Sequence, residues 1–231
     1  MKHKLNFVRL PNLPILDQLL LEETLLQYTN DNWFFTNTGS PPAIVLGSTC
    51  NPNELISPHF LKNPTWPVIK RFSAGGCVLI EPETWLVTLL CNKKKAPVNP
   101  FPEDVHTLME KILQNAVDHQ KFKLKENDYT IDDKKCGGNA QYFGKENWLH
   151  HSSLIAKYTP NSMHCLMQPE KQPKYRKQRS HDAFLCSLQD IVPSFEELID
   201  NIKIALQQWF DVRETHMPKM PIRTLKTKKL L

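Results

Sequence analysis

Two short stretches decide how this 231-residue chain is expected to fold: Lys70-Arg71-Phe72-Ser73-Ala74-Gly75-Gly76-Cys77-Val78 and Lys134-Lys135-Cys136-Gly137-Gly138-Asn139-Ala140-Gln141. In each, basic residues come shortly before a glycine doublet. The chain has only 7 glycines, whereas average usage of about 7% would give roughly 16. Because four of the seven lie in these doublets, we expect both to form turns in which glycine permits an unusual backbone conformation or a close approach.

Strand and helix patterns surround both stretches. Strands are predicted at residues 33–36, 43–46, 68–72, 77–80, 85–91, 129–131, 139–143 and 148–156. Apolar spacing predicts helices that begin at Pro14, Asn51, Pro102 and Ser194, the third of them reaching Phe122 and the last ending near Phe210. In the first helix we expect Glu22 and Glu23 to point outward. The pattern predicts an α+β domain of sheet and flanking helices.

The charge is unevenly distributed along the chain. The net charge is +5, and residues 211–231 hold six basic residues (Arg213, Lys219, Arg223, Lys226, Lys228 and Lys229) against Asp211 and Glu214. We therefore divide the chain into a domain at residues 1–210 and a basic, loosely ordered tail at residues 211–231. A nearly neutral body argues against a nucleic-acid partner.

Apolar runs and cysteines limit where the protein acts. No apolar run approaches the 18 or so residues of a membrane span, so no membrane partner is expected. The 6 cysteines form no CxxC pair and no secretory leader precedes them, which predicts free thiols in a reducing cytoplasm.

Both glycine-containing stretches have the chemistry of an anion site. Backbone amides in a small-residue turn can cradle an anion, and Arg71 would add a bidentate charge. A hairpin turn without a ligand is the alternative. Lys135 would place a second cation beside exposed amides, and Asn127 and Asp128 could hold a metal or a ribose. We interpret the two stretches as walls of one phosphate site, although neither is a P-loop or a dinucleotide fingerprint.

His150 and His151 lie in a predicted strand, where neighbouring side chains point to opposite faces. At most one of them therefore faces a given pocket, and a zinc pair is not expected. Cys77 and Cys136 adjoin the glycine doublets, but a catalytic thiol would need a lowered pKa that sequence does not reveal, so buried inert thiols are the simpler interpretation.

Taken together, these segments, with His150-His151-Ser152, resemble the lipoate-protein ligase A family of the biotin/lipoate ligase superfamily in order and spacing, over roughly residues 8–210. The resemblance implies a mixed, largely antiparallel sheet flanked by helices. Ala74 stands where the family usually has glycine, and Lys70 where it usually has arginine. After residue 210 we expect only the basic tail and not the small accessory domain that many ligases of this family carry.

The resemblance also implies an activity, its cosubstrates and its site. A lipoate or octanoate carboxylate would attack the α-phosphate of ATP with Mg²⁺, and a lysine of a lipoyl domain (E2) or of glycine cleavage H protein would then take the acyl group from acyl-AMP. Lys135 would be the catalytic residue, Asp128 would bind Mg²⁺, and a basic loop from Lys171 to Arg179 would close over the adenylate. The implied binding residues are Arg71, Ser73, Gly75, Gly76, Val78, Asn127, Asp128, Gly138, Asn139, Ala140 and His151. We expect a monomer.

Other functions stay open. The nearest is an octanoyl or lipoyl transferase of the same fold with a cysteine nucleophile ahead of the lysine; residues 121–134 contain no cysteine, which favours the adenylate route. A non-catalytic nucleotide- or lipoyl-binding module is a further possible function. Biotin ligation is disfavoured because a GRGRxGR-like loop is absent.

Overall fold

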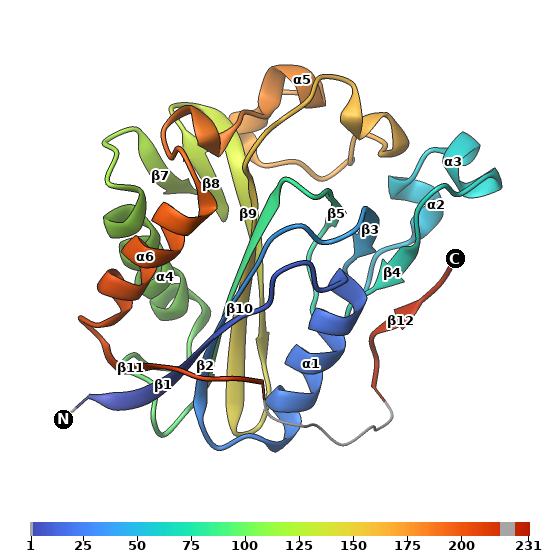
Figure 1. Cartoon of the computed structure of the whole chain (residues 1–231). Coiled ribbons are helices and arrows are strands. Elements are labelled where there is room, and N and C mark those ends of the chain that lie inside the picture. The colour runs from blue at the N-terminus through green and yellow to red at the C-terminus, as the bar shows by residue number, and fades with distance from the viewer. Residues whose placement is uncertain (1, 218–224) are drawn as a thin grey trace.

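The computed structural model describes residues 2–217 and 225–231, and an eight-stranded sheet is its largest element (Figure 1). In spatial order its strands are β11 (Phe210–Glu214), β1 (His3–Arg9), β2 (Asn32–Asn37), β6 (Thr84–Asn92), β10 (Asn147–Ile155), β9 (Lys134–Phe143), β8 (Asp128–Ile131) and β7 (Phe122–Lys125). β1 pairs in parallel with β2 and β11, and the other pairs are antiparallel. The predicted mixed, largely antiparallel sheet is confirmed.

A second sheet of four strands lies against the first. Its order is β12 (Lys228–Lys229), β4 (Val68–Lys70), β3 (Ala43–Leu46) and β5 (Cys77–Ile80), with β3 and β4 parallel. The loop that joins β4 to β5 carries the first of the two glycine-containing stretches. The small sheet therefore fixes both ends of that loop.

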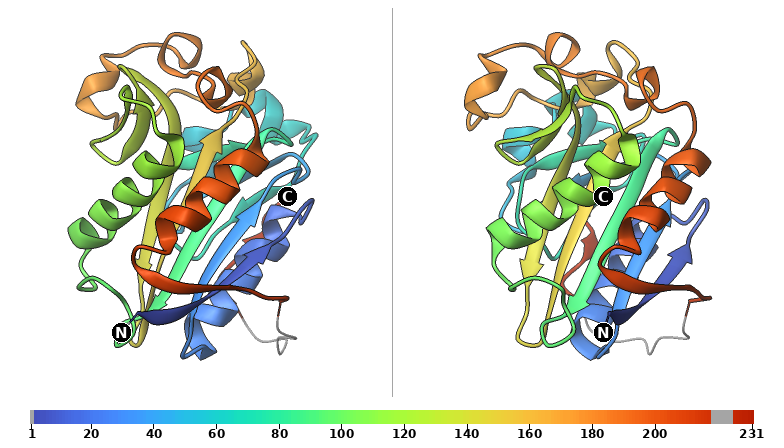
Figure 2. Two further views of the ribbon diagram at one scale, coloured as in Figure 1. Left: turned by 60° about the vertical axis from the view of Figure 1, so that its left-hand side comes forward. Right: turned by 90° about the vertical axis from the view of Figure 1, so that its left-hand side faces the viewer.

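In the described part of the chain, three long helices cover the sheets. α4 (Pro102–Val117) and α6 (Phe195–Leu206) lie side by side on one face of the large sheet, and α1 (Ile15–Tyr28) lies on the other face (Figures 1 and 2). The short helices are α2 (Pro52–Leu55), α3 (Pro58–Lys62) and α5 (His181–Phe184), with 3-10 turns at Ser162–Cys165, Lys174–Arg176 and Leu188–Asp190. The predicted caps are present: the side chains of Asn51 and Ser194 accept bonds from the backbone N–H of Asn53 and Glu197.

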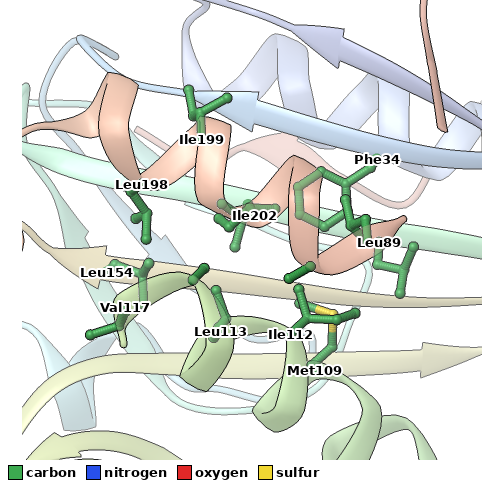
Figure 3. Packing of buried hydrophobic residues seen from close by; sticks show 14 of the residues in the cluster. Phe34, Leu89, Met109, Ile112, Leu113, Val117, Leu154, Leu198, Ile199 and Ile202 are labelled. Atoms are coloured by element: carbon green, nitrogen blue, oxygen red, sulfur yellow. The ribbon is translucent and has the colours of Figure 1, made fainter. Parts of the chain in front are cut away.

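The apolar core occupies three layers. Aliphatic side chains of α4 and α6, among them Leu113 and Ile202, pack against β6 and β10 (Figure 3). A second cluster fills the space between the large sheet, α1 and the small sheet, and a third lies on the outer face of the small sheet. The layers explain why β2, β3 and β6 are buried along their whole length and do not alternate as half-buried strands would.

Several boundaries differ from the prediction. The helix expected to reach Phe122 ends at Val117, because Asp118 adopts a left-handed conformation (φ 44°), and Phe122 begins β7. The strands β1 and β7 were not expected. The second glycine doublet lies within strand β9 and forms no turn. Packing requires glycine there, since a Cβ at Gly137 would come within 2.9 Å of the Ser153 carbonyl oxygen on β10.

The segment expected as a loose tail contributes to both sheets. β11 pairs with β1 and β12 pairs with β4, while Lys219 and Arg223 lie outside the described residues. The division at residue 210 stays a prediction. Among residues 2–217 and 225–231, no helix is long and apolar enough to cross a membrane.

We expect Leu113→Ala to lower the free energy of unfolding by about 2–5 kcal/mol, since its side chain is fully buried between α4 and the sheet. Ile204→Ala on α6 is the matched control, because Ile204 is 63% exposed, and it should change stability by less than about 1 kcal/mol. Urea denaturation followed by circular dichroism measures both, and equal losses would contradict the assigned core.

Candidate functional site

The loop between β4 and β5 holds a buried cation. Arg71 is 7% exposed, and its guanidinium donates from Nε to the Ser73 hydroxyl (2.9 Å) and from Nη2 to the Ala74 carbonyl (3.1 Å). Burial lowers the pKa of Arg71 from its usual range. Within the described part of the chain no carboxylate forms an ion pair with it. A buried, unpaired guanidinium is suited to an anionic ligand.

The glycine doublet beside Arg71 leaves the backbone accessible. Gly75 has φ +118°, which side chains rarely adopt, and a Cβ there would lie 2.6 Å from Arg71 Nη2. A Cβ at Gly76 would meet nothing within 4 Å. Both glycines are exposed, so a ligand can approach the backbone next to the cation. The half-buried Val78 follows in β5, opposite Val45.

A chain of hydrogen bonds runs from this loop into the core. The Ser73 hydroxyl is bonded to His151 Nε2 (3.0 Å), and His151 Nδ1 is bonded to the Glu22 carboxylate (2.9 Å). Glu22 also accepts bonds from the Thr88 hydroxyl (2.6 Å) and the Gln18 amide (2.8 Å). Loop, β10, β6 and α1 are thereby joined through one carboxylate.

The prediction that Glu22 and Glu23 point outward is wrong, since they are 0% and 2% exposed. α1 is covered on two sides, and each carboxylate finds its own partners. Glu23 accepts bonds from the backbone N–H groups of Lys226 and Thr227 (2.7 and 2.9 Å). Apolar periodicity does not reveal these bonds, because the partners come from distant parts of the chain.

The two histidines point to opposite faces, as predicted. His150 is fully buried and bonded to the Tyr129 hydroxyl and the Gln141 side chain, and burial lowers its pKa well below the usual value. His151 faces the loop that carries Ser73. Of the pair, His151 alone bonds to that loop in the described structure.

The second stretch carries an ion pair at a bulge of β9. The pairing of β8 with β9 shifts so that Tyr129 faces Gly137 and Thr130 faces Lys135, leaving Cys136 as the extra residue. The Lys135 ammonium lies 2.7 Å from Asp128 Oδ1. A Cβ at Gly138 would lie 3.1 Å from that ammonium nitrogen, so glycine leaves room for the lysine beside the strand.

The two stretches meet along β9. Ala140 pairs with His151 on β10, and the Ala140 Cβ would lie 3.5 Å from a Cβ placed on Gly75. Gly138 is two residues earlier on the same strand, about 7 Å at the usual rise, and alternation places it on the face of Ala140. The interpretation of the two stretches as walls of one site thus has geometric support.

Asparagines support the β8 side of this site. The Asn139 amide donates to the backbone carbonyl of Asn127 (2.8 Å), and its oxygen is bonded to His106 on α4 (2.9 Å). Asn127 itself is exposed at the turn before β8, with φ 136°. In this arrangement Asn139 fixes the turn that leads into Asp128.

A basic loop, residues 168–181, covers the ion pair. The Tyr175 hydroxyl donates to Asp128 Oδ2 (2.8 Å), and the backbone N–H groups of Lys174 and Tyr175 donate to Glu126 (2.9 and 3.2 Å). Burial and the neighbouring Asp128 raise the pKa of Tyr175, so it acts as a donor. The charge run predicts a basic loop, but neither Tyr175 within it nor Glu126 ahead of β8 gives a sequence signal of these contacts.

Asp128 is the only predicted metal ligand, and its fit to Mg²⁺ is limited. Both of its oxygens are engaged, by Lys135 and Tyr175. Residues 2–217 and 225–231 contain no group of three His, Cys, Asp or Glu side chains that could hold a metal. One carboxylate is enough for Mg²⁺ only when nucleotide phosphates and waters supply the other ligands.

We expect Glu22→Ala to destabilise the fold by about 3–5 kcal/mol, because it removes a buried carboxylate and leaves several donors unpaired. Asp17→Ala, at an exposed position of the same helix, should cost at most about 1 kcal/mol. The comparison uses urea denaturation. Equal costs for the two variants would show that the bonds to Glu22 contribute little.

Comparison with known proteins shows which family the chain matches. The model of the lipoyl protein ligase A/B catalytic domain matches residues 14–209. A curated relative, the inactive lipoate--protein ligase 2 of Plasmodium falciparum, is 28% identical in an alignment of 245 positions that covers 80% of this chain. The chain spans 63% of the length of that relative.

Solved structures share the fold. A candidate lipoate protein ligase of T. acidophilum with bound lipoic acid has a TM-score of 0.74 at 13% identity (95% of this chain, 91% of the other). A bi-partite lipoate protein ligase of Thermoplasma acidophilum, studied with its E2 lipoyl domain, has a TM-score of 0.76 at 13% identity, with 94% of this chain and 88% of the other covered. The structure of lipoate-protein ligase A bound with ATP has a TM-score of 0.74 at 14% identity, with 95% of this chain and 90% of the other covered. At these identities the likeness establishes the fold.

Proposed function

Since the chain belongs to the lipoyl protein ligase A/B catalytic-domain family, we propose that it is a lipoate-protein ligase, which activates lipoate or octanoate with ATP and transfers the acyl group to a lysine of a lipoyl domain or of H protein. The observation that carries this proposal is the buried Arg71, unpaired within the described structure, beside two exposed glycines. An acyl-adenylate supplies the anion that such a site lacks.

Each side of the site has a distinct role in the proposed reaction. Arg71 binds the anionic ligand, and the bonds from Ser73 through His151 to Glu22 hold its loop in place. Lys135 stabilises the negative charge that develops at the α-phosphate and then at the acyl carbonyl. To do so its ammonium exchanges the bond to Asp128, or shares it with the ligand.

Water exclusion gives the basic loop its role. An acyl anhydride hydrolyses when it is wet, so a covering segment protects the intermediate. Tyr175 fastens this segment to Asp128, next to Lys135. Bound with the nucleotide phosphates, Mg²⁺ would neutralise their charge, and Asp128 is the residue that would hold it.

A transferase with a cysteine nucleophile fits less well. Cys136 is the cysteine next to Lys135, but its side chain is 0% exposed and its pKa is raised well above the usual value. A nucleophilic thiol needs the opposite properties. The monomeric state and the cytoplasmic location stay predictions from the sequence.

A non-catalytic lipoyl- or nucleotide-binding module is the second candidate. The name of the P. falciparum relative, an inactive ligase, favours it. So does the engagement of both Asp128 oxygens by groups of the chain itself. The two candidates differ in whether pyrophosphate is released.

Lipoate-dependent exchange of pyrophosphate into ATP separates the candidates. The proposed ligase exchanges pyrophosphate and then modifies an isolated lipoyl domain, and Lys135→Ala should lower the exchange rate by about 10²–10³-fold. Lys134→Ala, at the exposed neighbouring position, is the control and should retain the rate.

Binding measured by calorimetry completes this test. Lipoate or ATP binding without any exchange would establish the non-catalytic module in place of the ligase. Exchange that survives Lys135→Ala would show that Lys135 is not the catalytic residue.

A further inference from the structure

Two cysteines meet where the segment after the basic loop returns to the large sheet. The backbone N–H of Cys186 donates to the Lys135 carbonyl (2.9 Å), and Leu185 forms a parallel bridge with Lys135. Cys186 is therefore next to Cys136 in register. The contact lies at the bulge of β9, one residue from the Lys135–Asp128 ion pair.

The two thiols are placed for a covalent bond. Cys136 belongs to the core cluster beneath α4 and α6, and Cys186 packs against that same cluster. The Cys186 Sγ lies 3.7 Å from the Lys134 carbonyl oxygen, and each of the two thiols is the largest influence on the pKa of the other. Neighbouring positions on adjacent strands are about 4.8 Å apart, within the Cα separation of about 4.4–6.8 Å that a disulfide spans.

The pair is chemically asymmetric. The neighbouring Cys136 thiol lowers the pKa of Cys186, whereas the neighbouring Cys186 thiol and burial raise the pKa of Cys136. Cys186 is also the accessible member, since it is partly exposed and Cys136 is buried. A partly exposed thiol with a lowered pKa beside a buried thiol has the arrangement of an attacking and a resolving cysteine.

We propose that Cys186 and Cys136 form a peroxide-responsive thiol pair that closes to an intramolecular disulfide. The Cys186 thiolate attacks a peroxide oxygen and becomes a sulfenic acid, while the O–O bond breaks and hydroxide or alkoxide leaves. The Cys136 sulfur then attacks the Cys186 sulfur, the S–O bond breaks, and the hydroxyl leaves as water with the Cys136 proton. In total the protein loses two electrons and two protons, and the peroxide takes them up.

The disulfide would fasten the return of the basic loop to the sheet. Leu185 and Cys186 follow α5, and the bridge would hold them to the bulge beside Lys135. The polar site itself is left intact. The pair depends on neither ligase nor binding activity, so its test is separate from that of the proposed function.

The test treats the full chain with hydrogen peroxide and maps its peptides by mass spectrometry. In wild type we expect a Cys136–Cys186 cross-linked peptide, a loss of two hydrogens, and full reversal by dithiothreitol. In Cys136→Ser, dimedone should trap a sulfenic acid on Cys186. In Cys186→Ser the cross-link should be absent.

Cys77→Ser is the matched control. Cys77 is also partly buried, but burial raises its pKa to about 12, so it should react at least about ten-fold more slowly than Cys186. The control variant should therefore form the cross-link as wild type does. The proposal is overturned if peroxide leaves both thiols free in wild type, joins either of them to a different cysteine, or places the dimedone adduct on Cys136 when Cys186 is intact. The first two of these outcomes, free thiols and a bond to a different cysteine, are measured on wild type alone. The proposal therefore stays testable even if a variant does not fold.

Discussion

One buried carboxylate joins the side chains of the site loop to α1 and to the large sheet. Glu22 is fully inaccessible and accepts bonds from three residues that belong to α1, β6 and β10. A carboxylic group in such a position is tolerated only when its hydrogen bonds are complete. The position of His151, and with it the Ser73 hydroxyl and the Arg71 side chain, therefore follows from where α1 packs on the sheet.

The other wall of the site depends on an irregularity of β9. The shift in pairing with β8 leaves Cys136 without an opposite residue and brings Lys135 beside Asp128. A regular strand would change the direction of the lysine relative to the sheet. One wall is thus set by a buried charge and the other by backbone geometry, and both end on the face of β9 that carries Gly138 and Ala140.

The sequence predicted the parts of this structure that local signals specify. Capping boxes at Asn51 and Ser194, the apolar stripe of α4 and most strands were evident because spacing and turn residues are local. The repeated pattern of basic residues ahead of a glycine doublet suggested that the two stretches belong to one site, and the resemblance supplied the family. Glu22 was placed wrongly because helical periodicity cannot reveal a buried carboxylate whose partners lie 66 and 129 residues away. The bulge of β9 and the bond from Tyr175 to Asp128 likewise arise from packing.

The neighbouring carboxylate, Glu23, holds the backbone of Lys226 and Thr227 just before β12. β12 then pairs with β4, which would otherwise be the free edge of the small sheet. An open edge is a template for strand exchange with another chain. Because β4 leads directly into Arg71, this two-residue strand separates the site loop from intermolecular β-pairing. By pairing with β4, the strand that leads into the buried Arg71, the last residues of the described chain thus protect the small sheet from misassembly.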